Sequence, residues 1–149
     1  MRILIDADGC PVVDETILLA QEYGAECFIL CDTAHYFNKD GAHTMVFSQG
    51  ADSVDFALVN MVQPGDIVVT QDYGLAAMCL ARKGNPINQN GMIYTEHNIA
   101  GLLASRHTAQ KIRRSGGRTK GPSKRMAAQN EAFICQLRKL ILAGLEQNK

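Results

Sequence analysis

The sequence of 149 residues contains no tryptophan, and aromatic residues make up only 6% of it. It has no apolar stretch of about 18 residues, so no transmembrane helix and no membrane partner are expected. The first apolar run, residues 3–5, is too short for a signal peptide and ends in acids. Hydrophobic residues make up 46%, which is enough for the core of one domain spanning residues 1–149. The sequence therefore predicts a cytoplasmic single-domain protein.

The sequence also lacks any CxxC pair, so a structural zinc site is not expected. Its five cysteines are an odd number, and all except Cys10 lie in apolar sequence. This pattern argues against a disulfide framework and favours reduced, buried thiols.

Positive charge is scarce in the first two thirds of the chain. Residues 1–97 contain 4 Lys or Arg and 13 Asp or Glu, a net charge of −9. Residues 98–149 contain 11 Lys or Arg and 2 Asp or Glu, a net charge of +9. The balance of zero therefore hides an acidic half suited to cations and a basic half suited to anions.

Short apolar runs alternate with segments of helical periodicity. This alternation predicts βαβ units and a three-layer α/β/α fold with a mostly parallel central sheet. The predicted strands are residues 2–6, 26–31, 43–47, 66–70 and 92–94, and the predicted helices are 12–23, 52–61, 75–82 and 99–106.

Two further segments complete the chain. Residues 107–124 contain three glycines, one proline and no acid, which predicts a basic loop. Residues 125–147 are predicted to form an amphipathic helix. That helix either packs on its own domain or pairs with a second copy in a homo-oligomer.

Acids follow the predicted strands. Asp6 and Asp72 come just after buried runs, and the carboxyl ends of parallel strands form the usual ligand crevice. Asp8 is two residues from Asp6 and points to the same side in an extended segment. Asp52 and Asp55 are neighbours on one helix face. Alternatively, Asp8 and Asp52 only cap helices, and Asp55 is a solvated acid.

Carboxylates gathered at one sheet edge would repel one another, and a divalent cation removes that penalty. Oxygen donors without an accompanying histidine favour Mg²⁺ or Mn²⁺ over zinc. Two such ions can activate water and stabilise the leaving oxygen of a phosphodiester. The predicted metal ligands are Asp6, Asp8, Asp52, Asp55 and Asp72.

The basic segment is predicted to bind the phosphate backbone of nucleic acid and hold it over the acids. The alternative is a solvated loop. The predicted contact residues are Arg113, Arg114, Arg118, Lys120, Lys124 and Arg125.

Four motifs together resemble the bacterial YaiI/YqxD family: Asp-Ala-Asp-Gly-Cys-Pro from residue 6, Gln-Gly-Ala-Asp-Ser-Val-Asp from 49, Val-Thr-Gln-Asp-Tyr-Gly-Leu-Ala from 69, and Gly-Gly-Arg-Thr-Lys-Gly-Pro from 116. That family is grouped with PIN-like domains, which with the related NYN domains include metal-dependent ribonucleases. The resemblance implies a PIN-like fold, with Asp6, Asp52 and Asp72 at the three catalytic acids of the NYN pattern. Gln49 and Gln71 depart from that pattern, which has lysine and glycine there.

The leading hypothesis is therefore a Mg²⁺- or Mn²⁺-dependent nuclease acting on RNA. Asp6 and Asp72 would ligate metal, Asp52 would complete the site, and Asp8 or Asp55 would orient water or a second ion. One alternative is a phosphatase, because Asp6-Ala-Asp8-Gly9 also resembles the haloacid-dehalogenase opening, in which the first Asp is the nucleophile. Another is a non-catalytic RNA-binding or scaffold protein that has lost turnover.

Overall fold

The structure is a computed structural model that describes residues 1–34, 38–48, 53–114, 116 and 124–147, with residues 107–114 described only as helical backbone. Within these residues, strands and helices alternate as the sequence predicted. The strands are β1 (Arg2–Asp6), β2 (Glu26–Asp32), β3 (His43–Phe47), β4 (Ile67–Val69) and β5 (Asn85–Ile87). The helices are α1 (Val13–Tyr23), α2 (Ser53–Met61), α3 (Tyr73–Ala81), α4 (Glu96–Arg114) and α5 (Ala127–Gln147).

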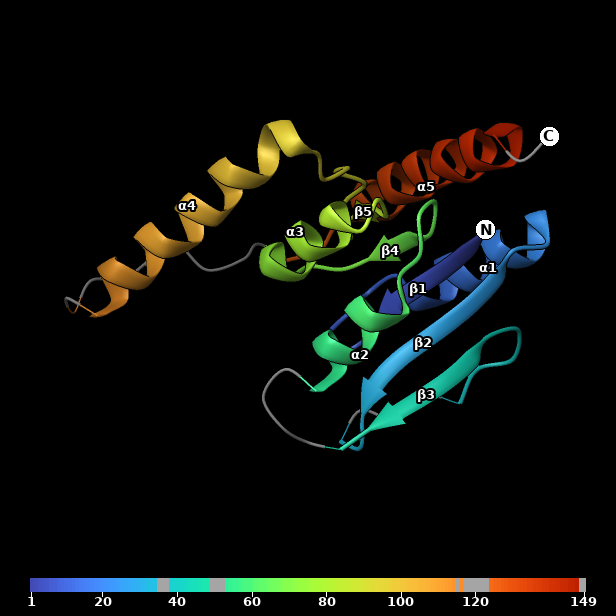
Figure 1. The fold of residues 1–149 in the computed structure, drawn as a ribbon, viewed down its shortest axis with the longest axis horizontal. Helices are drawn as coiled ribbons and strands as arrows, with labels where there is room; N and C mark the ends of the chain where they lie inside the picture. The colour runs from blue at the N-terminus through green and yellow to red at the C-terminus, as the bar shows by residue number, and fades with distance from the viewer. Residues whose placement is uncertain (35–37, 49–52, 115, 117–123, 148–149) are drawn as a thin grey trace.

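The described strands form one parallel sheet in the order β3-β2-β1-β4-β5 (Figure 1). The central strand β1 is buried on both faces. Its Ile3 and Ile5 pack with α1 and α5, whereas Leu4 packs with α2 and α3. The predicted three-layer α/β/α fold is therefore confirmed.

The predicted fifth strand at residues 92–94 is wrong. The edge strand β5 comes earlier, and Ile93 makes only an isolated antiparallel bridge to Ile87. The short Asn-Pro-Ile run was overlooked because proline donates no ladder hydrogen bond. Pro86 is tolerated here because the strand lies at the edge of the sheet.

The predicted loop 107–124 is wrong for its first eight residues, since α4 continues to Arg114. No glycine or proline interrupts residues 107–114, and several are good helix formers. The helix extends away from the sheet beyond α3 (Figure 1). Residues 117–123 of the predicted loop lie outside the described residues.

The amphipathic C-terminal helix is confirmed as α5 and packs on its own domain. Phe133, Leu137 and Ile141 recur every four residues and are fully buried against the sheet. The expectation of buried thiols holds for Cys27, Cys31 and Cys79, but Cys135 is exposed. It is exposed because it lies off the helix stripe that those three core residues form. No helix among the described residues is long and apolar enough to span a membrane.

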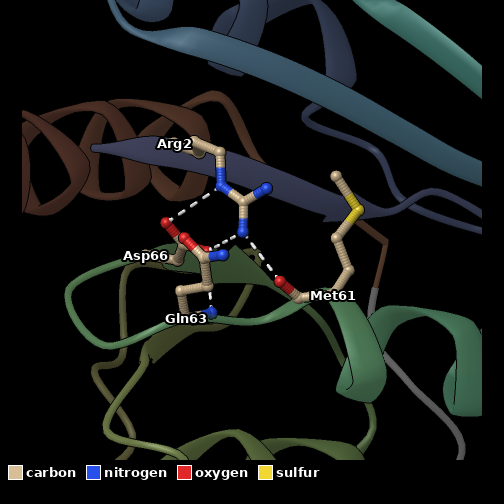
Figure 2. A network of polar contacts seen from close by, with 4 residues as sticks. All are labelled: Arg2, Met61, Gln63 and Asp66. Carbon is tan, nitrogen blue, oxygen red and sulfur yellow. Dashed lines mark hydrogen bonds and ion pairs between the residues drawn. The ribbon is translucent and has the colours of Figure 1, made fainter.

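A polar network fastens the start of β4 to β1 at the amino ends of the strands (Figure 2). The Nη2 atom of Arg2 donates to Asp66 Oδ2 at 2.6 Å and to the Met61 carbonyl at 2.7 Å. The backbone N–H of Gln63 donates to the same Asp66 oxygen at 2.9 Å. Asp66 is only 4% exposed, so these donors replace the water that its carboxylate has lost.

We predict that Asp66→Ala lowers the free energy of unfolding by roughly 2–4 kcal/mol, because it leaves Arg2 and the Gln63 N–H without their acceptor. Urea denaturation measures this loss. The matched control is Asp14→Ala, which removes an exposed ion pair with Lys39 and should cost less than about 1 kcal/mol. Equal losses in the two variants would contradict the structural role given to Asp66.

Candidate functional site

A cavity of about 570 Å³ opens at the carboxyl ends of the strands. It lies beside the junction of β1 and β4, from which the chain winds outward in opposite directions, and such a switch point is the usual ligand crevice of an open α/β sheet. Its described lining combines acidic side chains with a single cation. The lining residues are Asp6, Asp8, Gly9, Asp32, Ser53, Val54, Asp55, Gln71, Asp72, Tyr73 and Arg106.

Thr70 connects the two strand-end acids that the sequence singled out. Its hydroxyl donates to Asp6 Oδ2 at 2.8 Å and accepts from the Asp72 backbone N–H at 3.0 Å. The Thr70 carbonyl in turn accepts from the Tyr94 hydroxyl at 3.1 Å. Because both Thr70 and Tyr94 are buried, this chain of hydrogen bonds holds the acids on a rigid base.

Asp6 is the most strongly perturbed acid at the cavity. The pKa of its carboxyl is raised to about 6, chiefly by burial and also by the nearby charges of Asp55, Asp72 and Asp8. The hydrogen bond from Thr70 acts in the opposite direction because it favours the carboxylate. Asp6 can therefore exchange a proton near neutral pH, as functional acids in clefts often do.

Asp72 has a structural task that the sequence analysis did not foresee. Its Oδ1 accepts the Leu75 backbone N–H at 3.1 Å and so caps α3. The same oxygen lies 3.6 Å from Nη1 of Arg106, which comes from α4. A side chain at Gly74 would crowd the Asp72 oxygen, since an added Cβ would lie 3.3 Å from it, and would make ordinary contact with the Arg106 nitrogen at 3.5 Å.

The turn after β1 brings Asp8 to the cavity. Gly9 has a φ of 73°, a left-handed conformation that favours glycine. Its carbonyl accepts from Nε2 of Gln71 at 2.8 Å, which ties the turn to the end of β4. The alternative role of Asp8 as a cap of α1 is wrong, because the N-cap of that helix is Val12, without a side-chain hydrogen bond.

The structure gathers four of the five predicted acids, Asp6, Asp8, Asp55 and Asp72, around this cavity. Asp52 lies outside the described residues. Sequence reasoning missed Asp32, although it directly follows the predicted strand 26–31, and that position was the available signal. It also missed the site role of Arg106, which no local pattern distinguishes from its basic neighbours.

Of the basic residues predicted to contact nucleic acid, the structure describes the side chains of only two. No side chain is described for Arg113, Arg114, Arg118 or Lys120, and Lys124 is exposed. Arg125 is already engaged: its Nε, Nη1 and Nη2 donate to Asn130, Asn90 and the Gln89 carbonyl at 2.7, 2.8 and 2.6 Å. It fastens the start of α5 to the turn at residues 88–91, a structural task that the sequence analysis missed.

The donor set at the cavity consists of carboxylate and amide oxygens, which suit a hard cation such as Mg²⁺ or Mn²⁺. Among the described residues, no three acids, histidines or cysteines lie close enough together to hold one ion. Mg²⁺ commonly takes one or two carboxylates from a protein and keeps several waters.

The raised pKa of Asp6 predicts a loss of stability as pH rises. In chelator-treated protein the folded state holds the Asp6 proton up to about pH 6, whereas the unfolded chain releases it near its ordinary value of 3.8. The free energy of unfolding should therefore fall between those pH values, by about 2–3 kcal/mol from this group. Asp6→Asn should remove this fall and be the more stable protein at pH 7.5. Parallel curves for the two proteins in urea titrations from pH 3.5 to 7.5 would contradict this cause.

Comparison with known proteins agrees with the motifs. Residues 4–143 match the family described as "Uncharacterized BCR, YaiI/YqxD family". A UPF0178 protein of Exiguobacterium sibiricum is 61% identical over 89% of this chain and 91% of its own length. A UPF0178 protein of Clostridium acetobutylicum is 44% identical over 97% of this chain and 99% of its own. No solved structure matches the chain. The chain therefore belongs to the YaiI/YqxD family.

Proposed function

We propose that this protein is a PIN-like, Mg²⁺- or Mn²⁺-dependent nuclease that hydrolyses phosphodiester bonds in RNA. The observation that supports it is the convergence of Asp6, Asp8, Asp55 and Asp72 on one cavity at the switch point of a parallel sheet. These acids come from three separate segments of the chain. Of the three acids that the resemblance to NYN domains implies, Asp6 and Asp72 line this cavity, and Asp52 lies outside the described residues.

In this proposal Asp6 and Asp72 hold the ion, Asp52 completes the site, and Asp8 or Asp55 orients water or a second ion. A bound divalent cation supplies Lewis-acid activation of water and neutralises charge on the phosphate. The rigid hydrogen-bonded base under Asp6 and Asp72 fixes their spacing. The guanidinium of Arg106 provides a positive group for the phosphate that enters an otherwise acidic cavity.

The phosphatase alternative draws less support from this geometry. Haloacid-dehalogenase chemistry needs a lysine beside the nucleophilic aspartate. The described lining of the cavity holds no lysine, and its cation is Arg106, which lies beside Asp72 rather than Asp6. A protein that binds RNA without cleaving it is separated from a nuclease by the experiment that follows.

We predict that the purified protein cleaves RNA with Mg²⁺ or Mn²⁺ and not with EDTA. Asp72→Asn and Asp6→Asn should each lower the rate at least about 100-fold, because each removes a charge that positions the ion. Mg²⁺ should also raise the melting temperature more at pH 7.5 than at pH 5, since it binds ionised Asp6. Gel assays on single-stranded and structured RNA, with thermal melts alongside, measure both effects.

The matched control is Asp40→Asn, which changes the same chemical group in the exposed turn before β3, at the opposite edge of the sheet. It should leave cleavage and the metal-dependent melting shift unchanged. Tight RNA binding without cleavage in wild type would contradict the nuclease and support the scaffold. Equal loss in Asp40→Asn would mean that the acidic cavity is not the site.

The predicted basic segment gives a separate test. Neutralising Arg113, Arg114 and Arg118 together to glutamine should weaken RNA affinity and flatten its dependence on salt, because fewer phosphate contacts release fewer counterions. Fluorescence anisotropy between low and physiological salt measures the slope, and the metal-dependent melting shift should stay unchanged. An unaltered affinity would make the segment a solvated region with no part in binding.

A further inference from the structure

A second, smaller cavity adjoins the acidic one and differs from it in chemistry. It measures about 350 Å³ and lies where α2, α3 and α4 meet. Asp55, Asp72 and Arg106 line both cavities, so the two lie side by side. The remaining wall of the smaller cavity is Phe56, Gly74, Leu75 and Met78. We call this second cavity the apolar groove.

Two large apolar side chains are left exposed at the apolar groove. Phe56 is 63% exposed and Met78 is 41% exposed. The core-facing side of α2 is formed by Val54 and Leu58, so Phe56, two residues from each, points away from the sheet. A phenyl side chain placed there gains little of the free energy that burial of its apolar surface would normally contribute to folding.

The floor of the apolar groove is apolar, and its rim carries a positive charge. Leu75 is buried and closes the bottom, while Gly74 keeps the surface of α3 low beside it. Arg106 stands at the junction with the acidic cavity, with its side chain 48% exposed. The groove therefore offers an apolar surface of small size with a cation at its mouth.

We infer that the apolar groove holds one nucleobase of a single-stranded nucleic acid whose phosphate lies at Arg106. Bases stack on aromatic side chains, a thioether packs well against an aromatic ring, and a guanidinium binds phosphate. The volume is at the lower end for ligand sites, about 300–1,000 Å³, which suits one flat group rather than the face of a partner helix. This inference rests on the proposed function, because it places the scissile strand across the acidic cavity.

The groove also gives the substrate class. Bases in a duplex are stacked and paired, whereas bases in a single strand are free to turn outward. A structured RNA would therefore have to open before one of its bases could enter the groove. Stacking on Phe56 reads no hydrogen-bonding edge, hence little sequence preference is expected. The protein should accordingly favour unpaired segments over duplexes.

The test measures binding without turnover, in EDTA, to a fluorescent uridine oligonucleotide of about ten residues and to an abasic strand of equal length. Wild type should bind the uridine strand about tenfold more tightly than the abasic strand. Phe56→Ala should lose this preference by weakening only the uridine strand, whereas Phe56→Tyr should keep it. Arg106→Gln should weaken both strands alike and reduce the salt slope by about one.

The matched control is Leu18→Ala, since Leu18 is similarly exposed, at 65%, but belongs to α1 in the other helix layer. It should leave both affinities unchanged. A preference for bases that survives in Phe56→Ala, or that is absent from wild type, would overturn the inference even if RNA is cleaved. So would a Phe56→Ala protein that changes only its oligomeric state in sedimentation, because the groove would then be a contact between copies. If the protein prefers the uridine strand through Phe56 but does not cleave RNA, the result supports base binding in the groove and contradicts the proposed nuclease activity.

Discussion

The direction of the strands is the constraint on which the rest of the structure depends. A parallel neighbour is normally reached by a crossover that passes over one face of the sheet, so helices accumulate on both faces. The centre of the middle strand then loses contact with water, and Ile3, Leu4 and Ile5 are fully buried. The same constraint brings every carboxyl end to one edge, where residues distant in sequence become neighbours.

Aspartates at the two edges of this sheet have opposite electrostatic surroundings. At the amino edge, Asp66 is buried with Arg2 and backbone donors, so its charge is matched and serves stability. At the carboxyl edge, Asp6 is partly buried near other acids, and the pKa of its carboxyl is raised to about 6. Its main support is one hydroxyl from Thr70. A group that lowers the stability of the folded protein in this way is typical of functional positions rather than structural ones.

The sequence predicted well whatever depends on local periodicity. The bounds of β1 and β3 match the prediction, and the acids after β1 and β4 meet because strand direction follows from the βαβ pattern. The prediction failed where a local sequence rule was weak, or where the partner of a side chain lies far away in the sequence. Pro86 made an edge strand look unlike a strand. The glycines and the proline of segment 107–124 all follow residue 115, so they did not prevent α4 from continuing to Arg114.

Side-chain partnerships were less accessible from the sequence. Arg106 and Arg125 belong to one basic stretch, yet one reaches Asp72 at the cavity and the other holds a turn at residues 88–91. Their roles depend on which elements lie nearby in space, and no spacing along the chain encodes that. Asp32 is a milder case, because its place at the end of β2 follows the same strand-end rule as that of Asp6.

The position of α5 has a consequence for synthesis on the ribosome. The central strand β1 leaves the exit tunnel before the other described strands, and α5, which helps to cover one of its faces, follows all of them. Until Phe133, Leu137 and Ile141 emerge, the apolar face formed by Ile3 and Ile5 lacks much of its cover. The nascent chain therefore carries exposed apolar surface until α5 has been made, so the packing of this face of the sheet is completed only at that stage.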